Sequence, residues 1–147
     1  MPKVNWVKLV IAAVLMVIVG MVINNISAMM DMRHYMNPAY CQVWSKIMMP
    51  NAGPPPIEFF CWSLGLSFIA ALLFGWVYNV LKAAVPGSGV LIKGFWYGVL
   101  VFLVGSLPGM FSLYLLINLP RSLIASWTIS GFVIAVVDGC IVAWLIK

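Results

Sequence analysis

Residues 57 to 81 read IEFFCWSLGLSFIAALLFGWVYNVL, with a single charged side chain, Glu58, near the beginning. A helix needs about 20 mainly apolar residues to cross the hydrocarbon core of a bilayer. Lipid offers no hydrogen-bond partner to an open backbone, so a spanning run of this kind must be helical. The stretch therefore predicts a transmembrane helix.

The composition of the whole chain agrees with this interpretation. Of its 147 residues, 65% are hydrophobic and only 7% are charged, whereas a soluble domain has roughly 25% charged residues. The net charge of +5 would suggest nucleic acid if the basic residues formed a patch. They stand singly at the ends of apolar runs instead. We therefore expect the lipid bilayer as the surroundings of the chain, and no nucleic acid.

Four apolar runs are long enough to span a membrane. The predicted fold class is all-α, an integral membrane four-helix bundle that forms one membrane domain, residues 1–147, with an outer loop at 30–56. The first run resembles a signal peptide, but it is long for one and no A-x-A site follows, so we expect it to be retained. The helices are predicted at about 7–29, 57–81, 91–117 and 123–146.

Charged residues are distributed unequally between the two ends of these helices. One end carries lysines without acids, namely Lys3, Lys8, Lys82, Lys93 and Lys147. The other end is close to balance, with Asp31, Arg33, Lys46, Glu58 and Arg121. Loops rich in lysine and arginine stay in the cytoplasm. We therefore expect both termini on the cytoplasmic side of a bacterial inner membrane.

The two halves of the chain resemble each other. KLVIAAVLMVIVG at 8–20 aligns without gaps on KGFWYGVLVFLVG at 93–105, and 62–82 aligns on 127–147 with equal Trp-to-Lys spacing. Identity is low, and apolar helices also align by chance. The pattern predicts a tandem duplication of a transmembrane helical hairpin, with chance similarity as the alternative.

Asp138 is the acidic residue that interrupts a predicted span. Ionisable side chains at membrane depth are costly and are candidates for functional sites. Counted from the lysines at the helix ends, Asp138 is expected beside the third helix, near Ser106 and Pro108. The proline there leaves the Val104 carbonyl without its usual helical N–H partner. A protonated Asp138 would donate to that carbonyl or to Ser106.

Three roles fit such a residue. It can hold the third and fourth helices together, form a proton-linked or cation-linked site, or contact a partner subunit or a ligand head group. The third run also carries small residues within an arc of about 60° at 100° per residue. Small residues let helices approach closely, so they predict a packing seam, inside the chain or toward a partner: Gly94, Gly98, Gly105, Gly109 and Ser112.

The outer loop opens with MMDMRHYM, residues 29–36. Thioether ligands select copper(I), so this segment is a candidate metal site. The alternative is a helix that leaves the membrane, with methionines as apolar filler. Because no ligand spacing repeats, we expect no cofactor. The candidate ligands are Met29, Met30, Met32, His34 and Met36.

Two of the three cysteines, Cys41 and Cys61, fall on the outer side. In an oxidising compartment they would be able to form a disulfide, and two unpaired thiols are the alternative. Cys140 is expected to pack as a small apolar side chain.

The sequence contains no paired acids, no Ser/His/Asp set and no phosphate-binding loop, which are the signatures of catalysis that we sought. We therefore expect a non-enzymatic accessory or structural subunit of a larger membrane complex, in contact with other subunits or with itself. The alternatives are a small oligomeric transporter or channel that uses Asp138, and a periplasm-facing copper-binding protein.

Overall fold

The computed structural model describes residues 4–49 and 54–146. This part of the chain is helical and contains no strand, as the all-α prediction requires. Four helical segments are long and apolar enough to cross a membrane. They are α1 (Trp6–Met30), α3 (Ile57–Leu81), a composite segment at Val90–Leu116, and α6 (Arg121–Leu145).

The composite segment consists of three pieces. A regular helix α4 (Val90–Val101) passes into a π-helical stretch η2 (Phe102–Ser106), which passes into α5 (Leu107–Leu116). The Leu107 N–H donates to the Phe102 carbonyl, five residues back. Pro108, which has no N–H, follows directly. Proline removes a helical hydrogen bond, and a π-helical turn accommodates one additional residue.

Short elements and turns connect the spans. The four-residue helix α2 (Met32–Tyr35) and the 3-10 turn η1 (Pro38–Tyr40) follow α1. The Asn5 side chain accepts a hydrogen bond from the Lys8 N–H at 3.1 Å and so caps the start of α1. Between α3 and α4 the chain turns at Gly87, whose φ of +118° is a conformation that favours glycine.

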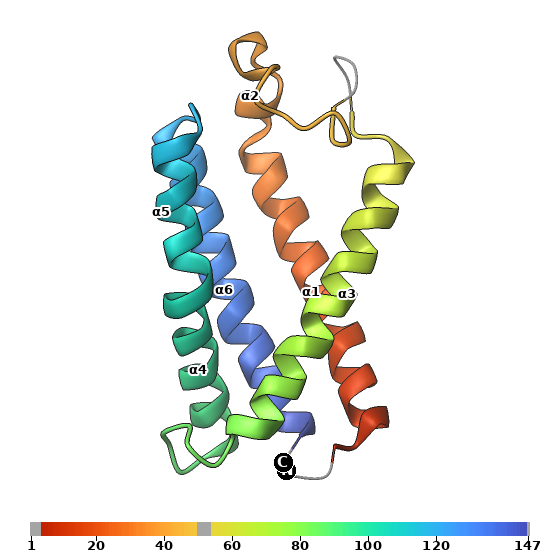
Figure 1. Ribbon diagram of the computed structural model, residues 1–147, viewed down its shortest axis with the longest axis vertical. Helices are drawn as coiled ribbons and strands as arrows, with labels where there is room; N and C mark the ends of the chain where they lie inside the picture. Colours follow the sequence, from red (N-terminus) through yellow and green to blue (C-terminus); the bar gives the residue numbers. More distant parts are fainter. Residues whose placement is uncertain (1–3, 50–53, 147) are drawn as a thin grey trace.

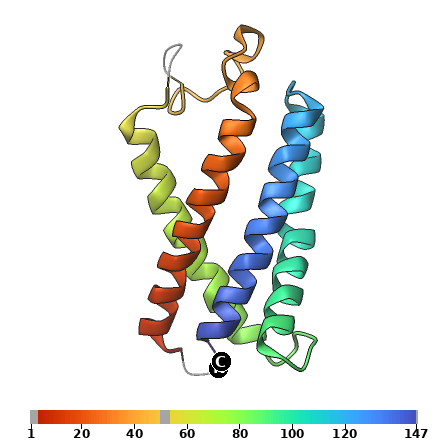
Figure 2. The same cartoon turned by 180° about the vertical axis from the view of Figure 1, so that it is seen from behind.

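The helices converge at one end of the molecule and diverge at the other (Figures 1 and 2). We call the first the lysine end, because it carries Lys8, Lys82 and Lys93. In both views α4 and α5 lie along α6, whereas α1 and α3 cross and then separate toward the opposite end. The crossing is made by small side chains, Ala12, Ala13 and Ala71, together with Met16.

The main core lies near the lysine end. It includes Leu9 of α1, Tyr78 of α3, Tyr97 of α4 and Val142 of α6, each 3% exposed or less. The Tyr97 hydroxyl donates to the Phe74 carbonyl at 2.7 Å, and the Tyr97 ring meets the Phe74 and Tyr78 rings edge-on. Edge-to-face contacts of this kind are favourable for aromatic rings. They join α3 to α4.

Candidate functional site

Two of the seam glycines lie at the contact between α4 and α6. A Cβ added at Gly94 would lie 2.6 Å from the Gly139 carbonyl oxygen, and one added at Gly98 would collide with the Ala135 carbonyl. A Cβ at Gly139 would likewise collide with the Gly94 carbonyl. The two backbones therefore approach as closely as small residues allow. Gly139 is a member of this seam that the sequence analysis missed.

The other three seam residues lie outside this contact. Gly105, Gly109 and Ser112 are exposed, and a Cβ added at either glycine would meet no atom within 4 Å. The prediction of one continuous face assumed 100° per residue along the whole run. The π-helical stretch takes up an additional residue, which turns every later side chain by about 100°. The structure therefore divides the predicted seam in two.

Asp138 lies on the core-facing side of α6, two turns before the C-terminal end of that helix. It stands one turn before Val142, which is fully buried, and residues four apart share a helix face. Its Oδ1 atom is buried and has no hydrogen-bond partner in the structure. A buried polar atom without a partner is costly, and Asp138 shares this feature with Asn79 of α3.

The predicted contact of Asp138 with the proline region is not formed. Asp138 lies between Ala135 and Gly139, the residues that meet Gly98 and Gly94, so Ser106 lies about three turns farther along. Pro108 is exposed, and the buried Oδ1 of Asp138 has no hydrogen bond to Ser106. The prediction placed Lys93 level with the end of α6. The structure instead sets the adjacent Gly94 beside Gly139 and Cys140.

The segment that follows α1 packs onto the beginning of α6. Ser27 lies 3.3 Å from Ser126, hydroxyl to hydroxyl, and the Ser122 hydroxyl lies 3.1 Å from His34 Nε2. The Trp127 indole N–H donates to the Tyr35 hydroxyl at 3.0 Å. The segment that was predicted as a helix exit or a metal site is thus held in place by α6.

Three rings form an outer aromatic cluster: Tyr35, Trp44 and Trp127, with centroids 5.1 to 6.5 Å apart. Burial raises the pKa of the Tyr35 phenol, the Trp127 N–H lowers it, and the nearby Asp31 carboxylate raises it. Tyr35 is therefore a neutral hydroxyl at physiological pH. Asp31 is itself 7% exposed and accepts from the Ser27 hydroxyl at 3.4 Å.

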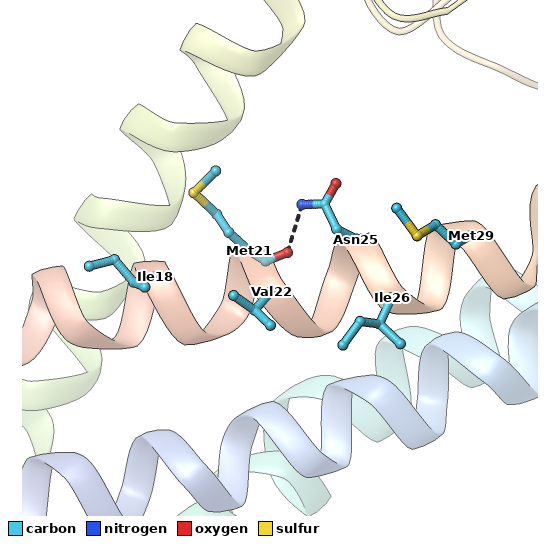
Figure 3. Close-up of a pocket in the computed structure, with 6 residues that line it drawn as sticks. All are labelled: Ile18, Met21, Val22, Asn25, Ile26 and Met29. Carbon is cyan, nitrogen blue, oxygen red and sulfur yellow. Dashed lines mark hydrogen bonds between the residues drawn. The ribbon is translucent and has the colours of Figure 1, made fainter.

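The methionines of the outer segment are largely exposed. Met29 lines a shallow groove on α1 with Ile18 and Met21 (Figure 3). Met29 is two residues after Ser27, so its groove lies on nearly the opposite side of α1. Ser27 is on the side that contacts α6. Met30, Met32 and Met36 are each more than half exposed. Among the described residues, no group of three His, Cys, Asp or Glu side chains could hold a metal ion.

All three cysteines are free thiols. Cys41 and Cys61 are both exposed, so the predicted disulfide is not formed in this structure. The Cys41 thiol lies 3.8 Å from the Asn37 carbonyl. Cys140 is half-buried, 3.8 Å from the Leu91 carbonyl, at the close contact of α4 and α6.

The lysine end contains interactions that the sequence analysis did not anticipate. Lys82 Nζ donates to the Ile146 carbonyl at 3.5 Å, and Lys93 Nζ donates to the Lys82 carbonyl at 3.4 Å. Both acceptors lie at helix C-termini, which attract cations. The position of Lys82 directly after an apolar run was the available signal. Asn79 was also missed: it is 2% exposed, and its Nδ2 has no partner.

Comparison with family models, with curated proteins and with solved structures finds no match to this chain.

Proposed function

We propose that this chain is an integral membrane protein and serves as a non-enzymatic accessory subunit of a larger membrane complex. Four helices of sufficient length and hydropathy support the membrane location. The lysines at one end support a cytoplasmic location for both termini, in the inner membrane of a bacterium. The tandem duplication stays a prediction from the sequence.

The observation that carries the subunit role is a packing face on α3. It is covered near the C-terminal end of α3 but has no neighbouring helix near the N-terminal end. Ala71, Gly75 and Tyr78 are buried on this face. Phe60 and Leu64 continue the same face at helical spacing, yet they are 45% and 40% exposed. Here α1 and α3 have separated (Figures 1 and 2). An apolar helix of another subunit would complete the packing.

Small residues in the diverging region support the same proposal. A Cβ added at Gly20 of α1 or at Gly65 of α3 would meet no atom within 4 Å. Glycines are enriched where membrane helices approach one another closely, as at Gly94 and Gly98. Glycines without a helical neighbour are accordingly available to a partner helix.

The test compares two tryptophan variants of α3. Leu64→Trp enlarges the packing face, and Leu66→Trp places the same side chain two residues away, on the opposite face, where Leu66 is 62% exposed. Tagged protein is extracted gently from its native membrane and weighed by native mass spectrometry. We expect a stoichiometric partner with the wild type and with Leu66→Trp, and about tenfold less with Leu64→Trp, the effect of overpacking by about 1.4 kcal/mol.

A chain recovered alone or as a bare homo-oligomer would contradict the subunit role. Equal loss of partner in both tryptophan variants would show that the packing face of α3 is not the site of contact.

A second function is favoured by the unpartnered Oδ1 of Asp138: a small oligomeric transporter or channel in which this carboxyl takes up a proton or a cation. The test is Asp138→Asn in vesicles with a potassium gradient and valinomycin, with proton uptake read by an internal pH dye. A proton-linked site predicts uptake that Asp138→Asn abolishes. A residue that only joins helices predicts equal traces, with a modest loss of thermal stability.

A further inference from the structure

A groove lies on the outside of the bundle, between the C-terminal end of α3 and one face of α4. It has a volume of about 410 Å³, and Tyr97 is one of its lining residues. Its remaining lining is apolar or glycine and comes from both sides: Leu81, Ala84 and Val85 at and after the end of α3, and Leu100, Val101, Val104 and Gly105 on α4 and η2. A groove of this composition is suited to an aliphatic chain.

A cation lies at one end of the groove. Lys93, Tyr97 and Leu100 follow one another at spacings of four and three residues, so they share a face of α4, and Val104 of η2 lines the same groove. Lys93 Nζ lies 3.4 Å from the Lys82 carbonyl, between the lining residues Leu81 and Ala84. The stripe of apolar side chains therefore ends at an ammonium group, at the lysine end of the molecule.

Among the described residues, Lys93 forms no ion pair with an acidic side chain. The chain contains three acids, and two of them, Asp31 and Glu58, stand at the opposite ends of α1 and α3. The third, Asp138, lies two turns inside α6. The acceptor of Lys93 is a neutral carbonyl at a distance longer than the 2.7–2.9 Å of a strong charge-assisted bond. A phosphate oxygen would be a better acceptor for it.

The length of the groove distinguishes between two candidate occupants, an acyl chain of a lipid and a transmembrane helix of another protein. From Lys93 to Val104 the helix rises roughly 16 Å, at 1.5 Å per residue. Half of the hydrocarbon core of a bilayer is about 15 Å, and a transmembrane helix from a partner would need about 30 Å. Lys93 and the groove together thus extend over about half of the hydrocarbon core of a bilayer, which is the reach of one acyl chain in one leaflet.

We propose that this groove binds an anionic phospholipid from the leaflet at the lysine end, with an acyl chain along Leu100 and Val104 and its phosphate at Lys93. Basic pockets between membrane helices recognise anionic head groups in this way. The inference rests on the proposed membrane location and is independent of the proposed subunit role.

Two variants test the two parts of the site. Lys93→Gln removes the cation, and Lys8→Gln is its control, with the same change of net charge at the same end but outside the groove. Gly105→Leu fills the groove without a clash, since a Cβ there meets no atom within 4 Å. Gly109→Leu makes the same change at an equally open position outside the lining.

The purified chain is incubated in detergent with equal amounts of phosphatidylglycerol and phosphatidylcholine of identical acyl chains, and bound lipid is weighed by native mass spectrometry. We expect about fivefold more phosphatidylglycerol than phosphatidylcholine on the wild type, the effect of one lysine near an anionic lipid. Lys93→Gln should remove this preference and Lys93→Arg should keep it. Gly105→Leu should lower the amount of both bound lipids.

Equal binding of the two lipids to the wild type would overturn the proposal, and so would an equal loss of preference in Lys8→Gln. Unchanged lipid binding in Gly105→Leu would exclude the groove, and this variant decides the matter if Lys93→Gln does not fold. A homodimer that Gly105→Leu disrupts would assign the groove to a second copy instead.

Release of the chain from membranes by alkaline carbonate would refute the membrane location itself. Loss of the partner subunit alone would leave the lipid site standing.

Discussion

At Gly98 the hydrogen on the α-carbon occupies the space where any other residue would place a methyl group. The carbonyl of Ala135 lies against that position, and the α-carbon of Val136 is close behind it. Both neighbours are backbone atoms of α6, which cannot rotate away as a side chain can. The separation of α4 and α6 is therefore set by glycine here and at Gly94 and Gly139.

Gly98→Ala should destabilise the chain, because the two helices must separate to admit the methyl group. Overpacking of this kind costs about 1–3 kcal/mol, which corresponds to an apparent melting temperature lower by roughly 3–10 °C for a chain of this size. Thermal unfolding in detergent measures it. Gly109→Ala, where the space is open, should have the melting temperature of the wild type. A similar decrease of the melting temperature in both variants would contradict the close contact.

At the scale of elements, the third span is the one whose geometry departs most from a regular helix. Its small residues were predicted on one face from their spacing, and that spacing holds only up to Phe102. The π-helical stretch that follows accommodates Pro108, which cannot donate a helical hydrogen bond. The proline was visible in the sequence, but a proline is compatible with a kink, a break or a π-helical turn. Which of the three occurs decides the direction of the side chains on α5, and this could be seen only in the structure.

The rotation of α5 can be measured by labelling. In a background with Cys41, Cys61 and Cys140 replaced by serine, Gly109→Cys should react with a lipid-soluble maleimide as fast as Leu115→Cys, which replaces a residue that is 79% exposed. Ala143→Cys, at a position 1% exposed, should react slowly. Protection of Gly109→Cys to the level of Ala143→Cys would show that the seam is continuous after all.

The helices and their order could be predicted from hydropathy. Each long helix is apolar on all sides, and this property is directly visible in the sequence. The pairing of those helices did not follow. Nothing in the residues around Asp138 indicates that Gly94, and not Phe102, lies beside it, since a uniform apolar surface gives no register. Contacts such as Lys93 with the Lys82 carbonyl depend on that register.

For the whole molecule, the lysine end and the opposite end differ in chemistry as well as in packing. The core and the lysines lie at one end, and Asp31, His34 and the outer aromatic cluster lie at the other. If the lysine end faces the cytoplasm, the two ends have opposite accessibility in intact cells.

A membrane-impermeant maleimide tests this orientation. Cys41 is exposed at the end opposite the lysines, so it should be labelled in intact cells whose outer membrane has been permeabilised. In a variant without native cysteines, Ser88→Cys, in the turn before α4, should be labelled only after the inner membrane is opened. The reverse pattern would invert the proposed topology.

The central position of α6 also has a consequence for biosynthesis. α6 contacts α1, α3 and α4, and it is the last of the four long helices to leave the ribosome. The carbonyls and glycine that hold α4, and the Val142 side chain that covers Leu9 and Gly75, are absent until that moment. The three earlier long helices are therefore synthesised before their common partner exists, and their packing is completed only when α6 follows.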